Sequence, residues 1–281
     1  MRERARALLL LPAGLWYALL LVAPLVVLLV FSFGTRSPNG GYLPGFTLEQ
    51  YTQIPTRITP LVNTVWYATL GTIGCLVVAY PLAYFLATRA GGWRFALLAL
   101  VVVPLWTSFL IRTYAWMFLL GSNGVPQIWE ELGLGRLVLI NTPFAIVLGL
   151  VYNYLPLMIL PLFVSLDRLD RSLLEGSRDL GAGPFATFRQ ITLPLSLPGI
   201  VSGCLLVFIP AMGEYLIPVL LGGGKTYFLG NALADLFLQS RNWPFGSAIG
   251  TAFVALMLGV VILYVALTAR LSRNRPDAQL L

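Results

Sequence analysis

Long apolar runs, separated by short polar stretches, dominate the pattern of the chain. Six of them approach the roughly 20 residues that a helix needs to cross a bilayer, although the second, third and fifth carry interruptions. We expect spans at residues 8–31, 61–86, 95–120, 143–166, 197–221 and 246–269. The pattern therefore predicts an all-α integral membrane protein with about six transmembrane helices.

The first apolar run could also be a secretory signal peptide, because Arg2, Arg4 and Arg6 precede it. However, the run is longer than the core of a typical signal peptide, and no clear small-residue cleavage site follows it. We therefore expect this segment to be retained as a membrane helix.

The composition supports a lipid environment. Of the 281 residues, 58% are hydrophobic and only 10% are charged, whereas a soluble domain carries about a quarter charged residues. The net charge of +7 does not indicate nucleic-acid binding, because the basic residues lie singly or in small groups between apolar runs. Such placement is typical of loops beside an anionic membrane surface.

The basic residues also predict an orientation. With the N-terminus inside, twelve arginines fall in inner segments and five basic residues in outer ones, while Arg112 falls inside the third run, for a total of 18. Because inner loops carry the excess of Lys and Arg, both termini are expected to be cytoplasmic.

The sequence excludes common catalytic chemistry. It contains no His, the commonest general base and metal ligand. Its two cysteines, Cys75 and Cys204, each lie in an apolar run and suit buried packing rather than a zinc site or a disulfide. We therefore expect neither a metal nor a catalytic site on this chain.

The inner segment from Asp167 to Pro194 differs from the other loops, because it is long and mixed in charge. Leu166, Leu169, Leu173 and Leu180 recur at helical spacing and predict a short amphipathic helix. The stretch 181–184, Gly-Ala-Gly-Pro, should end that helix, and Pro184 suits the first turn of a second one. Two short helices are therefore expected on the inner surface.

This segment also carries a motif. Glu175, Gly181, Ile191, Leu193 and Pro194 match, in identity and spacing, the cytoplasmic signature E-A-A, three residues, G, nine residues, I-x-L-P. Small residues, Gly176 and Ser177, replace the two alanines. The chain thus resembles the permease subunits of binding-protein-dependent ABC importers.

That resemblance implies a type I ABC importer permease fold, with one transmembrane domain over residues 1–281, a core at about 61–269 and a coupling loop at about 167–194. It implies that Glu175, Gly176, Ser177, Gly181 and Pro194 serve in coupling to an ATPase subunit. The implied partners are a second permease subunit, two ATPase subunits that hold ATP and magnesium, and an external solute-binding protein. No cofactor is expected on this chain.

Further segments resemble permeases of spermidine/putrescine importers, although permeases for other small solutes share much of the pattern. They are Leu105–Arg112, Gly213–Pro218, Leu221–Gly223 and Asn242–Gly246. The stretch Gly222–Thr226 looks like part of a P-loop, but Val219 stands where the full pattern needs a glycine. ATP hydrolysis is therefore expected on another chain.

Polar residues within the runs are candidates for the substrate path, since charge in a membrane costs about 2.5–3.5 kcal/mol on insertion scales. Glu214 should lie near the outer end of the fifth run, where it would either face a cation or pair with Arg112. Asn153, beside Tyr152, should lie near mid-membrane and either line a polar path or bond between helices.

The fifth run contains Pro198, Pro210 and Pro218 and is expected to be bent or broken, which suits a helix that lines a cavity. Residues 229–239 should form a short helix. Asp235 could hold an ammonium group beside aromatic faces, while Trp243 is either part of that site or an interfacial anchor.

Two rival classes remain. A secondary transporter would need ion-coupling acids and internal repeats, but only Glu214 is available. A membrane enzyme would need clustered reactive groups, and the chain has no such cluster. The preferred interpretation is an importer subunit of a bacterial inner membrane, with an importer of another small solute as the alternative.

Overall fold

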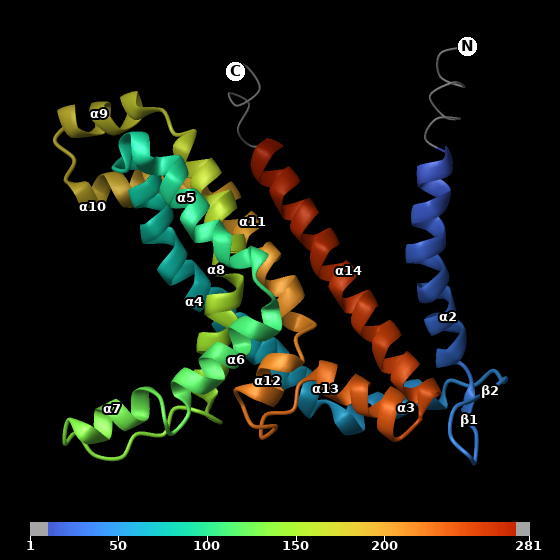
Figure 1. Ribbon diagram of the computed structural model, residues 1–281. Coiled ribbons are helices and arrows are strands. Elements are labelled where there is room, and N and C mark those ends of the chain that lie inside the picture. The colour runs from blue at the N-terminus through green and yellow to red at the C-terminus, as the bar shows by residue number, and fades with distance from the viewer. Residues whose placement is uncertain (1–10, 274–281) are drawn as a thin grey trace, which may run out of the picture. The chain divides into compact units, whose positions relative to one another are not determined.

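The computed structural model describes residues 11–273, which are mostly helical (Figure 1). The longer helices, with at least nine residues each, are α2 (Ala23–Ser32), α4 (Thr59–Thr88), α5 (Arg94–Val102), α6 (Phe109–Leu120), α8 (Pro143–Asp167), α9 (Arg171–Asp179), α11 (Leu193–Met212) and α14 (Trp243–Arg273). The short ones are α3 (Glu49–Gln53), α7 (Val125–Glu131), α10 (Pro184–Thr187), α12 (Leu216–Leu220) and α13 (Leu229–Ala234).

Short turns of other helix types join several of these helices. Three are 3₁₀ turns: η2 (Ile54–Arg57), η3 (Gly91–Trp93) and η4 (Val103–Trp106). Three are π turns: η1 (Ala18–Val22), η5 (Phe188–Thr192) and η6 (Asp235–Gln239). Among the described residues, the only strands are β1 (Thr35–Arg36) and β2 (Tyr42–Leu43), which form an antiparallel pair.

Five helical segments are long and apolar enough to cross a membrane: Leu11–Ser32, Thr59–Thr88, Pro143–Asp167, Pro184–Met212 and Trp243–Ala266. A sixth span would need Gly91–Trp106 and Phe109–Glu131 together, and these meet at 93°. The prediction of about six spans is confirmed, but the third is not one straight helix. The extended residue Thr107, after Pro104, separates the two parts.

The described residues group into two compact units, one formed by 11–58 with 231–273 and the other by 59–230. The prediction of a single domain over 1–281 with a core at 61–269 therefore stays a prediction. Arg2, Arg4, Arg6 and Arg275 lie outside the described residues, and the cytoplasmic position of both termini also stays a prediction.

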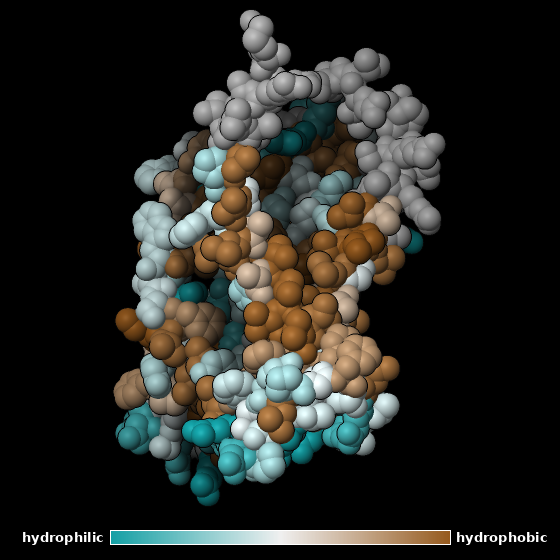
Figure 2. Space-filling model, turned by 90° about the vertical axis from the view of Figure 1, so that its right-hand side faces the viewer, coloured by the Kyte–Doolittle hydropathy of each residue, from teal (hydrophilic) through white to brown (hydrophobic). Residues whose placement is uncertain are grey.

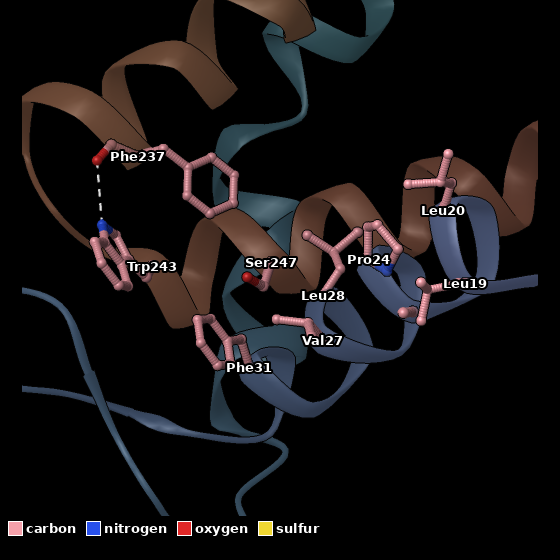
Figure 3. Close-up of a pocket in the computed structure, with 10 residues that line it drawn as sticks. Leu19, Leu20, Pro24, Val27, Leu28, Phe31, Phe237, Trp243 and Ser247 are labelled. Atoms are coloured by element: carbon pink, nitrogen blue, oxygen red, sulfur yellow. Dashed lines mark hydrogen bonds between the residues drawn. The ribbon is translucent and has the colours of Figure 1, made fainter. Parts of the chain in front are cut away.

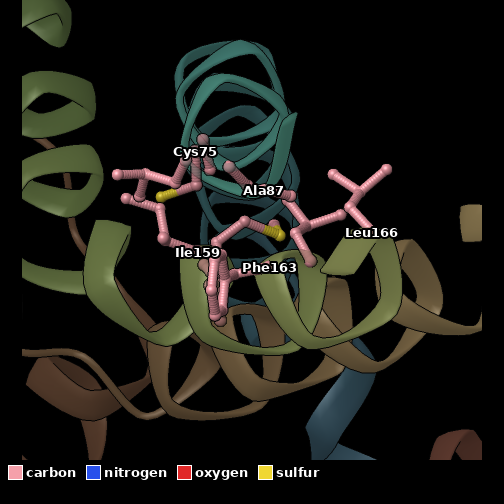
Figure 4. Packing of buried hydrophobic residues seen from close by; sticks show 11 residues of the cluster. Cys75, Ala87, Ile159, Phe163 and Leu166 are labelled. Carbon is pink, nitrogen blue, oxygen red and sulfur yellow. The ribbon is translucent and has the colours of Figure 1, made fainter. Parts of the chain in front are cut away.

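The unit formed by residues 59–230 has its core between α4 and α8, with α11 packed on both. Small residues on α4 let the backbones approach, as is usual between membrane helices. A Cβ built at Gly71 would lie 3.0 Å from the Leu150 Cβ, and one at Gly74 would lie 2.7 Å from a Val151 methyl. Figure 4 shows Ile159 and Phe163 of α8 beside α4 in the same cluster.

Helix α11 packs on α8 equally closely. A Cβ at Gly199 would lie 2.5 Å from the Ser165 Cβ and 2.8 Å from the Pro161 carbonyl oxygen. The close contact fixes α11 along the half of α8 that leads to α9. This packing positions both candidate sites described below.

The other unit packs α2 against α14, where Gly250 contacts Leu28. Tyr51 of α3 donates a hydrogen bond of 2.7 Å to Ser32 at the end of α2. The face shown in Figure 2 has a broad zone of apolar side chains and hydrophilic ones at its lower end. Side chains of the first span, such as Leu15 and Leu21, are 61% exposed, as expected for a lipid-facing helix.

Candidate functional sites: a surface helix pair and a buried carboxylate

The predicted helix pair between the fourth and fifth spans is present as α9 and α10 (Figure 1). Asp170 caps the N-terminus of α9, because its carboxylate accepts a 2.9 Å hydrogen bond from the Ser172 backbone N–H. The same hydrogen bond lowers the pKa of the exposed Asp170 carboxyl below its ordinary value of 3.8. A local capping interaction thus defines where the first helix begins.

The C-terminus of α9 ends on Gly181, whose φ is +80°. The Gly181 N–H donates to the Arg178 carbonyl at 2.8 Å, and the Ala182 N–H donates to the Ser177 carbonyl at 3.0 Å. This pair of bonds is a Schellman motif, which needs a left-handed residue that glycine adopts at low cost. The predicted break is confirmed, and α10 begins at Pro184.

Helices α9 and α10 are joined by a buried hydrogen bond of 2.9 Å between the hydroxyls of Ser177 and Thr187. Glu175 and Gly176 are exposed, and Pro194 lies half-buried in the first turn of α11. Leu180 and Phe185 are 89% and 75% exposed. This end of the unit therefore presents exposed apolar and acidic side chains together.

The second candidate site is the break between α11 and α12. Helix α11 ends at Met212, just past Pro210, and the chain restarts as α12 at Leu216. Glu214 lies in this break and is only 7% exposed. Its Oε1 accepts hydrogen bonds from the backbone N–H groups of Tyr215 (3.0 Å), Leu216 (2.9 Å) and Ile217 (3.3 Å).

The other oxygen of Glu214, Oε2, accepts a 2.7 Å hydrogen bond from the Tyr154 hydroxyl. Tyr154 is near the middle of α8, roughly 17 Å from its first residue at the helical rise. The predicted break in the fifth span is confirmed, and it falls between Met212 and Leu216, beside Glu214. The hydrogen bond joins the Glu214 carboxylate to Tyr154 of α8, while the position of Glu214 near the outer end of the span stays a prediction.

Arg112 does not pair with Glu214. Among the described residues, the only close ion pair joins Arg94 and Asp167 at 2.7 Å. The Nε and Nη1 atoms of Arg112 are buried and have no hydrogen-bond partner, while its guanidinium lies 5.8 Å from the centre of the Phe109 ring. Tyr154, which the sequence gave no reason to single out, takes the place expected for Arg112.

Asn153 and Tyr152 precede Tyr154 on α8, and their role in the substrate path stays a prediction. Asn153 is buried, and its Nδ2 donates to the Gly149 carbonyl of its own helix at 2.9 Å. Its Oδ1 is buried without a hydrogen-bond partner. Tyr152 contacts Trp116 edge to face, with ring centroids 5.3 Å apart.

Asp235 and Trp243 belong to the unit formed by 11–58 and 231–273. The predicted short helix over 229–239 is present as α13 followed by η6, which begins at Asp235. Trp243 donates from Nε1 to the Phe237 carbonyl at 3.2 Å and lines an apolar groove with Phe31 and Leu28 (Figure 3). Asp235 does not line this groove, and the predicted role of Asp235 and Trp243 in the substrate path stays a prediction.

The sequence and the fold together identify the class of protein to which the chain belongs. Residues 72–275 match the family described as the inner membrane component of binding-protein-dependent transport systems. The chain belongs to this family and is the permease subunit of an ABC importer, a transport component rather than an enzyme. The membership decides against a secondary transporter and against a membrane enzyme, and it places the chain in the inner membrane.

Individual relatives are similar over almost the whole chain. The spermidine/putrescine transport system permease protein PotB of Haemophilus influenzae is 39% identical, covering 92% of each chain. PotB of Escherichia coli K12 is 36% identical, covering 94% of this chain and 98% of its own. The structure of a bacterial alginate ABC transporter with a periplasmic protein matches with a TM-score of 0.73 at 17% identity, covering 96% of each chain, and supports the fold.

Proposed function

We propose that this chain, paired with a second permease subunit, forms the path of an importer for polyamines such as spermidine and putrescine. Two ATPase subunits, which bind ATP and magnesium, dock on the α9–α10 helix pairs of the two permeases. An external solute-binding protein delivers the polyamine. ATP-driven closure of the ATPases moves the helices between inward-open and outward-open arrangements.

The exposed α9–α10 surface carries the proposal of an ATPase partner. Leu180 and Phe185 are too exposed and too apolar to be explained by contacts within their own unit, and Glu175 lies exposed on the same helix pair. A protein groove would cover the apolar groups while donors of the partner meet the carboxylate.

The relatives and Glu214 support a polyamine as the solute. Both curated relatives are named for spermidine and putrescine transport, and a polyamine is a chain of cationic amines that needs counter-charges. Glu214 is a buried acid at a helix break, where irregular backbone can line a path. To meet an amine, its carboxylate must exchange hydrogen bonds with Tyr154 or with the start of α12.

Glu175 provides the test of ATPase docking. We expect Glu175→Ala, and more strongly Glu175→Arg, to weaken co-purification of a co-expressed ATPase and to lower polyamine-stimulated ATP hydrolysis several-fold in the reconstituted complex. Glu131→Ala is the matched control, because Glu131 is an exposed helical acid at the other end of the unit. Unchanged binding and hydrolysis in both Glu175 variants would reject docking through this helix pair.

The solute is tested separately. The assembled complex with its binding protein should hydrolyse ATP faster with spermidine or putrescine, and not with amino acids or phosphate. Stimulation by one of the other solutes, without any by polyamines, would support the alternative of an importer for a different small solute.

A further inference from the structure

Helix α7 has a complete apolar side that nothing in its own unit covers. Val125, Ile128, Trp129 and Leu132, at helical positions i, i+3, i+4 and i+7, share one side of the helix. Their exposed fractions are 42%, 60%, 41% and 69%. Contiguous exposed apolar groups of this kind indicate a binding surface rather than a surface in contact with water.

The opposite side of α7 is polar. Gln127, Glu130 and Glu131 lie there, and the Gln127 side chain donates to Glu131 Oε1 at 2.9 Å. Water suits this side, since the three groups are exposed. The helix therefore separates an apolar environment on one side from an aqueous environment on the other.

The position of α7 within its unit decides which apolar environment is available. It lies between the end of α6 at Leu120 and the start of α8 at Pro143, whereas α9 follows the opposite end of α8 (Figure 1). Because α8 is long and apolar enough to cross the membrane, its Pro143 end and its α9 end belong to opposite surfaces, and α7 belongs to the surface opposite the α9–α10 pair.

The segment after α7 continues the apolar surface and is folded onto the helix. Leu134 and Val138 are 56% and 61% exposed. Trp129 donates from Nε1 to the Leu134 carbonyl at 3.2 Å, which leaves its ring on the apolar side. A tryptophan with a satisfied N–H and an exposed ring is typical of the membrane–water interface.

We propose that α7 lies in the plane of the bilayer interface, with Val125, Ile128, Trp129 and Leu132 in the lipid of the leaflet opposite the α9–α10 pair. The solute-binding protein fits this surface less well. A partner that must leave after each delivery would expose the whole apolar side to water every time, whereas lipid is always present. The inference is independent of the solute and of the ATPase contact.

Spin labels on the two sides of α7 provide the test. The cysteines Cys75 and Cys204 are replaced with Ala, and a nitroxide is attached to Ile128→Cys on the apolar side or to Glu131→Cys on the polar side. The protein is reconstituted in phosphatidylcholine vesicles, and relaxation by oxygen and by a water-soluble nickel chelate is compared. We expect the oxygen-to-nickel ratio to be several-fold higher at position 128 than at position 131.

Two results would overturn the proposal. Equal access of the nickel chelate to both labels would place the apolar side in water. Protection of the label at position 128 from both oxygen and nickel would show that protein, such as the second permease, covers it.

A second measurement leaves both native cysteines in place. Brominated phosphatidylcholine quenches the emission of tryptophans that contact lipid. We expect it to quench a component of the emission in the parent protein that is missing from the Trp129→Phe variant. Identical quenched components in the two proteins would contradict lipid contact at Trp129, even if the cysteine-free protein did not fold.

Discussion

Two glutamates of the same unit show two different uses of a carboxylate. Glu214 is 7% exposed and accepts hydrogen bonds from three backbone N–H groups and the Tyr154 hydroxyl. Glu175 is exposed on α9, and no hydrogen bond restrains its carboxylate. The buried group holds its own fold together, while the exposed one remains available to a partner.

The two side chains are chemically identical, so the difference in their roles comes from their surroundings. A carboxylate removed from water must be surrounded by donors, and those donors then depend on it. A carboxylate in water needs no internal partner and adds little to stability. A substitution of Glu214 should therefore lower the stability of the chain, whereas a substitution of Glu175 should weaken partner binding and leave the stability nearly unchanged.

The largest effect on stability is expected at Glu214. Glu214→Ala removes the acceptor of four hydrogen bonds in a buried place and should lower the free energy of unfolding by about 3 kcal/mol. Glu214→Gln keeps an acceptor oxygen for the start of α12 and should lose only about 1 kcal/mol. Detergent-titration unfolding of the purified chain measures both.

Transport by the same two variants separates the roles of this carboxylate. If Glu214 also meets the cationic solute, Glu214→Gln abolishes polyamine transport despite its near-normal stability. Full transport by Glu214→Gln would leave this residue with a structural role only. Equal free energies of unfolding for the Ala variant and the parent would mean that these four hydrogen bonds do not stabilise the fold.

A smaller effect on the free energy of unfolding is expected when a glycine is replaced with alanine, either on α11 where it packs on α8 or on the exposed helix α9. Gly199→Ala places a Cβ 2.5 Å from the Ser165 Cβ and 2.8 Å from the Pro161 carbonyl oxygen, so α11 must shift. We expect a loss of about 2 kcal/mol in the free energy of unfolding. Gly176→Ala is the matched control.

At Gly176 no atom lies within 4 Å of an added Cβ. An alanine there should stabilise α9 by about 0.5–1 kcal/mol, because it lowers the entropy of the unfolded chain. Thermal unfolding of the two variants gives the comparison directly. Equal changes of the same sign in the unfolding temperatures of the two variants would contradict the difference in packing between Gly176 and Gly199.

The smallest effect concerns the start of α9 and depends on pH. The N-cap hydrogen bond holds the pKa of Asp170 below 3.8, so its contribution is complete above that value and is lost as the pH falls through the lowered pKa. The hydrogen-exchange rates of the α9 amides, corrected for intrinsic rates, should therefore increase as the pH falls through this lowered pKa.

The control for this pH effect is Asp170→Asn, because asparagine caps a helix without titrating. Its α9 amides should show no such acid-dependent increase. The same increase in both proteins would mean that another group controls the start of α9.

Much of the fold could be predicted from the sequence, because it depends on local signals. Long apolar runs predicted the spans, and the Gly-Ala-Gly-Pro stretch at 181–184 predicted the break between α9 and α10. These signals act within one or two helical turns. The motif containing Glu175 and Gly181 likewise identified the family that the match over residues 72–275 confirms.

The sequence did not reveal features that depend on packing between distant segments. The hydrogen bond between Tyr154 and Glu214 joins residues 60 positions apart, and no local pattern distinguishes it from a pair with Arg112. Helix α7 was missed because its seven residues are too short for a span, and the surrounding glycines and prolines read as a loop.

One continuous helix, from Pro184 to Met212, joins the surface pair to the break at Gly213. It contains 29 residues, which corresponds to about 43 Å at the α-helical rise. Its regular hydrogen bonding ends at Met212, so a displacement transmitted along this helix from the surface pair would reach the loop that holds Gly213 and the Glu214 carboxylate.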